Sequence, residues 1–107
     1  MTFRVVILHS AKSNLKDIKS YVIRQFSTST WQHTYDALKQ TMRRLETHPH
    51  ADSIPEEIEK LNLSQYRQVI SGMNRIIYEI RDQTIYVHVI ADTRKNLQAL
   101  LLKILIQ

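Results

Sequence analysis

Two arginines occupy positions from which a guanidinium could bind an anion. Arg75 lies in a stretch rich in isoleucine and tyrosine, beside polar residues, where it could hold a phosphate or carboxylate through two parallel hydrogen bonds. Arg94, followed by Lys95, comes between a stretch rich in valine and isoleucine and an apolar run with helical spacing. A guanidinium at a strand end beside a helix start is a common anion-binding arrangement. The alternatives are a surface ion pair between Arg75 and Glu79, and plain solvation of Arg94.

The five histidines do not have the spacing of a metal site. The closest pair, His48 and His50, flanks a proline, and no His-x-x-x-His or carboxylate-histidine helical spacing occurs. The chain has no cysteine and a single glycine, so thiolate metal sites, thiol nucleophiles and glycine-rich phosphate loops are excluded. We expect no metal and no cofactor, and neither an ordinary hydrolase nor a nucleotide-binding fold.

Length and composition indicate one globular domain over residues 1–107. Hydrophobic residues make up 43% of the chain and charged residues 23%, which is enough to form a packed core. Lys and Arg number 15 against 10 Asp and Glu, and the net charge of +5 suggests an anionic partner. No apolar stretch approaches the roughly 20 residues that span a bilayer, and the N-terminus lacks the features of a signal peptide. We expect a soluble, cytoplasmic protein with no membrane contact.

The first half of the chain is expected to place two helices after one strand. Residues 3–8 form a β-branched, apolar run that predicts a buried strand. Apolar residues at helical spacing then predict a helix over residues 11–26, capped by Ser10, and a second over 31–45, capped within Ser27–Thr30. Helices joined so closely must form an antiparallel hairpin. A short helical turn is expected after Pro55.

The second half is expected to form a three-stranded meander. Residues 65–70, 74–80 and 84–91 alternate with period two and are joined by short turns, and Gly72 suits a turn position with positive φ. If Gly72 and Met73 are the central turn residues, Ile70 lies opposite Arg75 and Gln68 opposite Ile77. One face of the sheet then carries Tyr66, Gln68, Arg75, Ile77 and Glu79.

A C-terminal helix over residues 97–105 completes the predicted fold, with Asp92 and Thr93 as candidate caps. The fold class is therefore α+β, in the order β-α-α-β-β-β-α. It consists of one antiparallel sheet with the helical hairpin packed on one face.

Two stretches of the second half carry a family resemblance. One is the hairpin over residues 66–80, a Tyr-Arg pair, a turn and then Arg-Ile-Ile-Tyr; the other, residues 89–101, is a hydrophobic strand, a basic pair and Leu-x-x-Leu-Leu. With the order of the elements, these stretches resemble the RelE/ParE toxin superfamily over nearly the whole chain. The resemblance implies a RelE/ParE-like fold and a bacterial toxin of a type II toxin-antitoxin system. Plasmid stabilization is a function that the resemblance associates with such systems. Such a toxin inhibits growth and is neutralised by a cognate antitoxin.

The superfamily divides by mechanism. The RelE branch cleaves messenger RNA on the ribosome without a metal, and Arg75 and Arg94 match its two arginine positions. Tyr66 and Gln68 stand where that branch has lysines, and no Tyr or His follows His88, so the nuclease set is incomplete. The ParE branch keeps the scaffold without the nuclease set, and the resemblance to it implies a non-enzymatic inhibitor of DNA gyrase.

We therefore favour a ParE-like gyrase inhibitor neutralised by an antitoxin. One alternative is a RelE-like, ribosome-dependent mRNA endonuclease with altered catalytic residues, in which Arg75, Arg94 and Tyr66 are the catalytic candidates and His88 a further substitute base. The other is an inactive relic that only binds an antitoxin. Whether the protein is an enzyme depends on the branch. The expected target-binding residues are Arg75, Arg94 and Lys95, and the expected antitoxin-binding residues are Trp31, Tyr35, Leu97 and Leu101.

Overall fold

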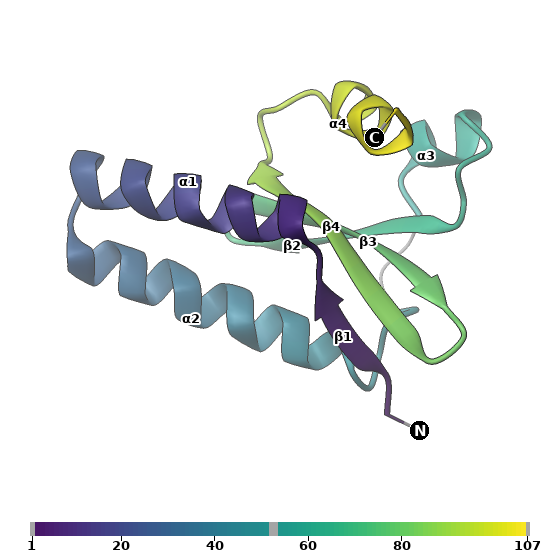
Figure 1. Ribbon diagram of the computed structural model, residues 1–107, viewed down its shortest axis with the longest axis horizontal. Helices are drawn as coiled ribbons and strands as arrows, with labels where there is room; N and C mark the ends of the chain where they lie inside the picture. Colours follow the sequence, from purple (N-terminus) through teal and green to yellow (C-terminus); the bar gives the residue numbers. More distant parts are fainter. Residues whose placement is uncertain (1, 52–53, 107) are drawn as a thin grey trace.

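The computed structural model describes residues 2–51 and 54–106, and these form a mixed α+β fold (Figure 1). The order of elements confirms the predicted arrangement, with the short helix after Pro55 included. In chain order they are β1 (Arg4–Ile7), α1 (His9–Gln25), α2 (Thr28–Leu45), α3 (Glu56–Lys60), β2 (Tyr66–Ser71), β3 (Asn74–Arg81), β4 (Thr84–Asp92) and α4 (Leu97–Leu105).

The sheet has the strand order β1-β4-β3-β2. The meander of β2, β3 and β4 is antiparallel as predicted, and its register places Ile70 opposite Arg75 and Gln68 opposite Ile77. Gly72 has a φ of 58°, as its turn requires. The expectation of a wholly antiparallel sheet is wrong at one edge, because β1 pairs with β4 in parallel. A tight turn dictates antiparallel pairing, but β1 and β4 are joined through most of the chain, so no local signal sets their relative direction.

Helices cover both faces of the sheet. The hairpin of α1 and α2 packs on one face around Leu38, Leu45 and Tyr78. On the other face α3 and α4 pack around Ile58 and Leu101. In Figure 1 the hairpin extends well past the end of the sheet, while α3 and α4 group together near the C-terminus.

An extra residue in β4 changes the direction in which its side chains point. Ile77 pairs with Val89 and Tyr78 with Val87, which leaves His88 unmatched in a β-bulge. Val87 packs in the core under the hairpin, whereas Val89 packs under α4. The bulge therefore places the His88 side chain on the same face as Tyr66 and Glu79.

Two polar side chains of α1 continue the edge of β4 where β1 ends. Ser10 was predicted to cap this helix, but α1 already begins at His9, so the prediction is wrong. The Ser10 hydroxyl instead donates to the His88 carbonyl at 2.8 Å. One helical turn later, the Asn14 amide oxygen accepts the Ile90 N–H at 3.0 Å. These bonds satisfy backbone groups of β4 that β1 is too short to reach.

The caps of the other two long helices are side chains that accept a backbone N–H. Ser27 caps α2 by accepting the Thr30 N–H, as predicted. The cap of α4 is Asn96, not Asp92 or Thr93, because Asp92 still belongs to β4. None of the helices within the described residues is long and apolar enough to span a membrane.

Candidate functional site

Arg94 projects from a tight turn that joins β4 to α4. The Asp92 carbonyl accepts the Lys95 N–H at 3.0 Å, and the Asp92 carboxylate accepts the Arg94 N–H at 2.8 Å. The same carboxylate receives Arg94 Nε at 2.9 Å and Nη2 at 3.0 Å, a two-point grip that fixes the plane of the guanidinium. These bonds from Arg94 lower the pKa of Asp92 to about 2, so the carboxylate is charged at neutral pH. The Arg94 side chain remains 75% exposed.

Arg75 is held inside the fold. Its Nη1 donates to the Gln68 amide oxygen at 2.6 Å, and its Nη2 donates to the Thr93 carbonyl at 2.9 Å. The alternative of an Arg75–Glu79 ion pair is wrong, because four strand positions separate these residues and Glu79 has other partners. Arg75 and Arg94 are thus attached to the same turn, one from behind and one from its exposed side.

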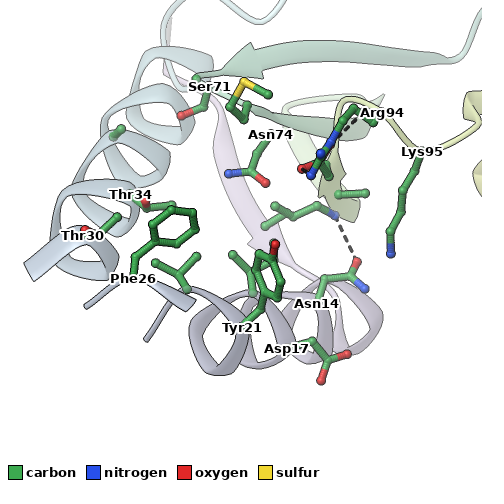
Figure 2. A pocket seen from close by; sticks show the side chains of 18 of the residues that line it. Asn14, Asp17, Tyr21, Phe26, Thr30, Thr34, Ser71, Asn74, Arg94 and Lys95 are labelled. Atoms are coloured by element: carbon green, nitrogen blue, oxygen red, sulfur yellow. Dashed lines mark hydrogen bonds and ion pairs between the residues drawn. The ribbon is translucent and has the colours of Figure 1, made fainter. Parts of the chain in front are cut away.

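An open groove of about 960 Å³ lies beside this turn (Figure 2). It separates the outer half of the helical hairpin from the β2–β3 turn and the end of β4. Arg94 and Lys95 lie on one side of it, with Phe26 and Thr30 on the opposite side. The hydrogen bond and charge of Asp92 raise the pKa of Arg94, and Tyr21, which reaches toward the turn, adds a smaller effect in the same direction.

The apolar part of the groove is open to solvent. Tyr21 is 47% exposed, Phe26 67% and Met73 62%. Phe26 is the last apolar residue at helical spacing in the helix predicted over residues 11–26, but it lies just past the end of α1 and is exposed. Helical periodicity identifies the apolar side of α1 but not where the supporting sheet ends, and the outer end of the hairpin lies beyond it.

The acid-base candidates form a separate cluster. The Tyr66 ring meets His88 edge-on, with centroids 5.4 Å apart, and His88 Nε2 lies 3.0 Å from Glu79. Burial raises the pKa of Tyr66, and the charge of Glu79 adds to the effect, so the phenol keeps its proton at neutral pH. Burial also raises the pKa of Glu79, but hydrogen bonds from Arg81 and His88 outweigh it and leave that pKa below its ordinary value.

This cluster does not meet the arginines. Tyr66 lies opposite Glu79 and Ile70 opposite Arg75, so four strand positions, about 13 Å of backbone, separate Tyr66 from Arg75. Between them Ile77, Val89 and Ala91 are covered by apolar side chains of α4. The structure therefore brings Arg75 and Arg94 to one turn but leaves Tyr66 and His88 at a distance from both.

The four expected antitoxin contacts lie in two different environments. Trp31 stacks on Tyr35 at the start of α2, with centroids 5.3 Å apart and an interplanar angle of 19°. Leu97 and Leu101 are buried against the sheet, and the exposed apolar residues of this segment are Leu102, Leu105 and Ile106. A contact of these four residues with an antitoxin stays a prediction.

Several residues of the site were not identified from the sequence. Gln68 was placed on the same face as Arg75, but no pattern indicated that it binds the guanidinium. Asp92 was interpreted as a helix cap, although a carboxylate two residues before an arginine can also grip it. Tyr21, Phe26 and Met73 become neighbours only through the tertiary fold.

Comparisons with known proteins agree with this architecture. Residues 5–97 match the family described as ParE toxin of type II toxin-antitoxin system, parDE. The chromosomal ParDE toxin-antitoxin system from P. aeruginosa contains a similar chain, with a TM-score of 0.71 at 10% identity, covering 85% of this chain and 96% of that one. The RelBE2 toxin-antitoxin complex from Mycobacterium tuberculosis also contains a similar chain. Its TM-score is 0.59 at 14% identity, and the match covers 86% of this chain and 99% of that one. A search of curated protein sequences found no match.

Proposed function

The chain belongs to the ParE toxin family of type II toxin-antitoxin systems, and from this premise we propose that it inhibits DNA gyrase and is neutralised by a cognate antitoxin. The family match is the observation that carries the proposal, because it runs from β1 to the first residue of α4. The protein is the toxin component of such a system.

The position of the acid-base candidates supports inhibition by binding rather than by cleavage. Metal-free cleavage of RNA needs a base at the attacking hydroxyl and cations at the same phosphate. Here Tyr66 is protonated and lies about 13 Å from Arg75 along the sheet. The apolar side chains of α4 cover the surface between them. Arg75 already donates hydrogen bonds to Gln68 and Thr93, so its guanidinium is engaged inside the fold instead of at a scissile phosphate.

The turn with Arg94 and Lys95 is the surface that we propose for the target. Both side chains are exposed, and Asp92 holds Arg94 in one orientation. A guanidinium with its plane fixed offers its remaining N–H groups to a carboxylate or carbonyl of a partner at little cost in conformational entropy.

The groove beside this turn is the surface that we propose for the antitoxin. Tyr21, Phe26 and Met73 present exposed apolar area, and Arg94 and Lys95 lie at its edge. An antitoxin segment with large apolar side chains and nearby carboxylates would complement both features. Such a segment would also cover Arg94 and Lys95, so neutralisation would follow from occlusion of the target surface.

The experiment is a supercoiling assay with purified protein, DNA gyrase and relaxed plasmid. We expect the protein to block supercoiling or to cause gyrase-dependent cleavage of the plasmid, and addition of the antitoxin to reverse this. Arg94→Ala should weaken this effect on gyrase. Lys103→Ala, which removes an exposed cation from the far end of α4, is its matched control. Unimpaired gyrase together with cuts in translated messenger RNA would establish the RelE-like alternative. Normal growth on induction of the gene alone would establish an antitoxin-binding relic.

A further inference from the structure

The turn that carries Arg94 and Lys95 is fastened to the sheet through both backbone groups of Thr93. Its N–H donates to the Met73 carbonyl in the β2–β3 turn at 2.8 Å, and its carbonyl accepts Arg75 Nη2 at 2.9 Å. The second bond thus adds a side-chain tie to the backbone bond of the Thr93 N–H and to the bonds within the turn.

Arg75 connects this turn to the edge strand of the sheet. It stands on β3, and its guanidinium extends from Gln68 on β2 to Thr93 beyond the end of β4. The side chain is only partly exposed, and its Nε is fully buried without a hydrogen-bond partner among the described residues. At least two of its donors therefore serve internal contacts, and a third is closed to any partner.

We propose that Arg75 and Gln68 are positioning residues of the target-binding turn, which hold it so that Arg94 and Lys95 face the partner while neither Arg75 nor Gln68 contacts the target. The inference rests on the proposed function only in taking the Arg94 and Lys95 surface as the one that meets the target. It separates the two arginines, which the sequence presented as equivalent anion binders, into one that supports and one that contacts.

The chemistry of the side chains makes the proposal specific. A guanidinium is planar and carries several donors in fixed directions, so it can bond Gln68 and Thr93 at once. A lysine at this position would keep the charge but would lose the planar group whose two separate nitrogens face Gln68 and Thr93. Glutamate in place of Gln68 would keep the acceptor and strengthen the bond to Arg75. Arg75→Lys should therefore loosen the turn, whereas Gln68→Glu should preserve it.

The first experiment measures amide hydrogen exchange of Thr93 and Lys95 in the full chain, which requires no target. In Arg75→Lys and Gln68→Leu we expect exchange of these amides to rise about tenfold, the loss that one hydrogen bond would allow. In Gln68→Glu, and in the control Arg43→Lys on the exposed face of α2, exchange should stay as in the parent chain. The Leu38 amide in α2 reports whether each variant remains folded. Unchanged exchange at Thr93 and Lys95 in folded Arg75→Lys would overturn the proposal.

The second experiment is a double-mutant cycle read by titrating gyrase binding. If Arg75 acts through the turn, Arg75→Lys weakens binding by about tenfold in the parent chain but by less than about twofold when Arg94 and Lys95 are both already alanine. Equal losses in both backgrounds would show that Arg75 itself contacts gyrase and would overturn the assignment. Failure of the parent chain to bind gyrase would count against the proposed function, and the exchange experiment would still decide the positioning role.

Discussion

At the scale of single residues, Arg94 combines exposure with a fixed orientation. The neighbouring Asp92 cancels much of its charge, so the pair contributes direction more than long-range attraction, while Lys95 supplies net positive charge. A target that recognises this turn should therefore depend on the geometry of the guanidinium.

The first prediction concerns that geometry. Arg94→Lys keeps the charge but loses the two-point bond to Asp92, and we expect at least about a fivefold loss of gyrase inhibition. Lys95→Arg, which keeps an exposed cation, should be close to neutral. Both variants should stay folded at neutral pH because the side chains are exposed. Equal inhibition by Arg94→Lys and the parent chain would show that charge alone matters.

The second prediction concerns the acid stability of the same pair. Folding lowers the pKa of Asp92 from 3.8 to about 2, so the folded protein binds this proton less readily than the unfolded chain. The stabilisation is present above the unfolded value and is lost as the pH falls from about 4 to 2. The carboxyl signal of Asp92 in an NMR titration should have its midpoint near 2, and Arg94→Ala should return it toward 3.8. In addition, the Tm of Asp92→Asn should fall less on acidification than that of the parent chain, with Asp17→Asn as the control. A titration midpoint of Asp92 near 3.8 would show that Arg94 does not hold this carboxylate through hydrogen bonds in solution.

A buried hydroxyl gives the third prediction. Tyr78 is fully buried, and its hydroxyl donates to the Pro49 carbonyl at 2.6 Å, which ties the segment after α2 to the sheet. Tyr78→Phe leaves that buried carbonyl without its donor, at a cost of about 1–3 kcal/mol in the free energy of unfolding. Urea denaturation measures the loss, and Tyr86→Phe, at a partly exposed ring on β4, should change stability much less. A difference below about 0.3 kcal/mol between the two variants would mean that water replaces the lost donor.

At the scale of elements, the contact between α1 and β4 replaces part of a missing strand. β1 pairs with β4 only as far as Val87, and Ser10 and Asn14 bond the backbone of β4 beyond that point. Helix α1 is therefore held to the sheet by directional bonds as well as by apolar packing, and these bonds set the position of the groove that its outer half lines.

The fourth prediction tests this edge. Asn14→Ala removes the acceptor of the Ile90 N–H, and we expect a loss of about 1–2 kcal/mol together with faster exchange of the Ile90 amide. Asn14→Asp keeps an oxygen in place and should recover most of the protection. Ser13→Ala, on the exposed side of the same helix, is the matched control. Slow exchange of Ile90 in Asn14→Ala would mean that another group satisfies the N–H.

Local signals predicted the elements well where covalent connections are short. Gly72 and the alternation around it determined the β2–β3 register, and Ser27 identified the start of α2. The parallel pairing of β1 was not predicted, because it joins residues far apart in the chain. The bulge at His88 was not predicted either, because an alternating pattern does not mark the position of an extra residue. The turn between β3 and β4 contains Asp82 at a φ of 54°. Aspartate tolerates this conformation, but its presence in a sequence does not predict it.

At the scale of the whole molecule, the sequence identified the two arginines but not the different roles that we propose for them. Alternation placed Arg75 on a face with Gln68, and the position of Arg94 after a strand was correct. That both attach to one turn could not be predicted, since the bond from Arg75 goes to a backbone carbonyl, which every residue possesses. The groove depends on how far the helical hairpin extends past the sheet, and hydrophobic periodicity carries no information on that length.

The last prediction concerns this groove as the antitoxin site. Phe26, just after α1, is 67% exposed, and Ile23, within α1 and outside the groove lining, is 37% exposed, so the protein should stay folded with serine at either position. If an apolar segment of the antitoxin fills the groove, Phe26→Ser should weaken the complex at least about tenfold by calorimetry, as loss of a buried aromatic anchor does, whereas Ile23→Ser should not. Cells that express Phe26→Ser should need more antitoxin for rescue, because the toxin keeps Arg94 and Lys95. Equal affinity of both variants for the antitoxin would place its binding surface elsewhere, and the exposed residues Leu102 and Leu105 of α4 would be the next to substitute.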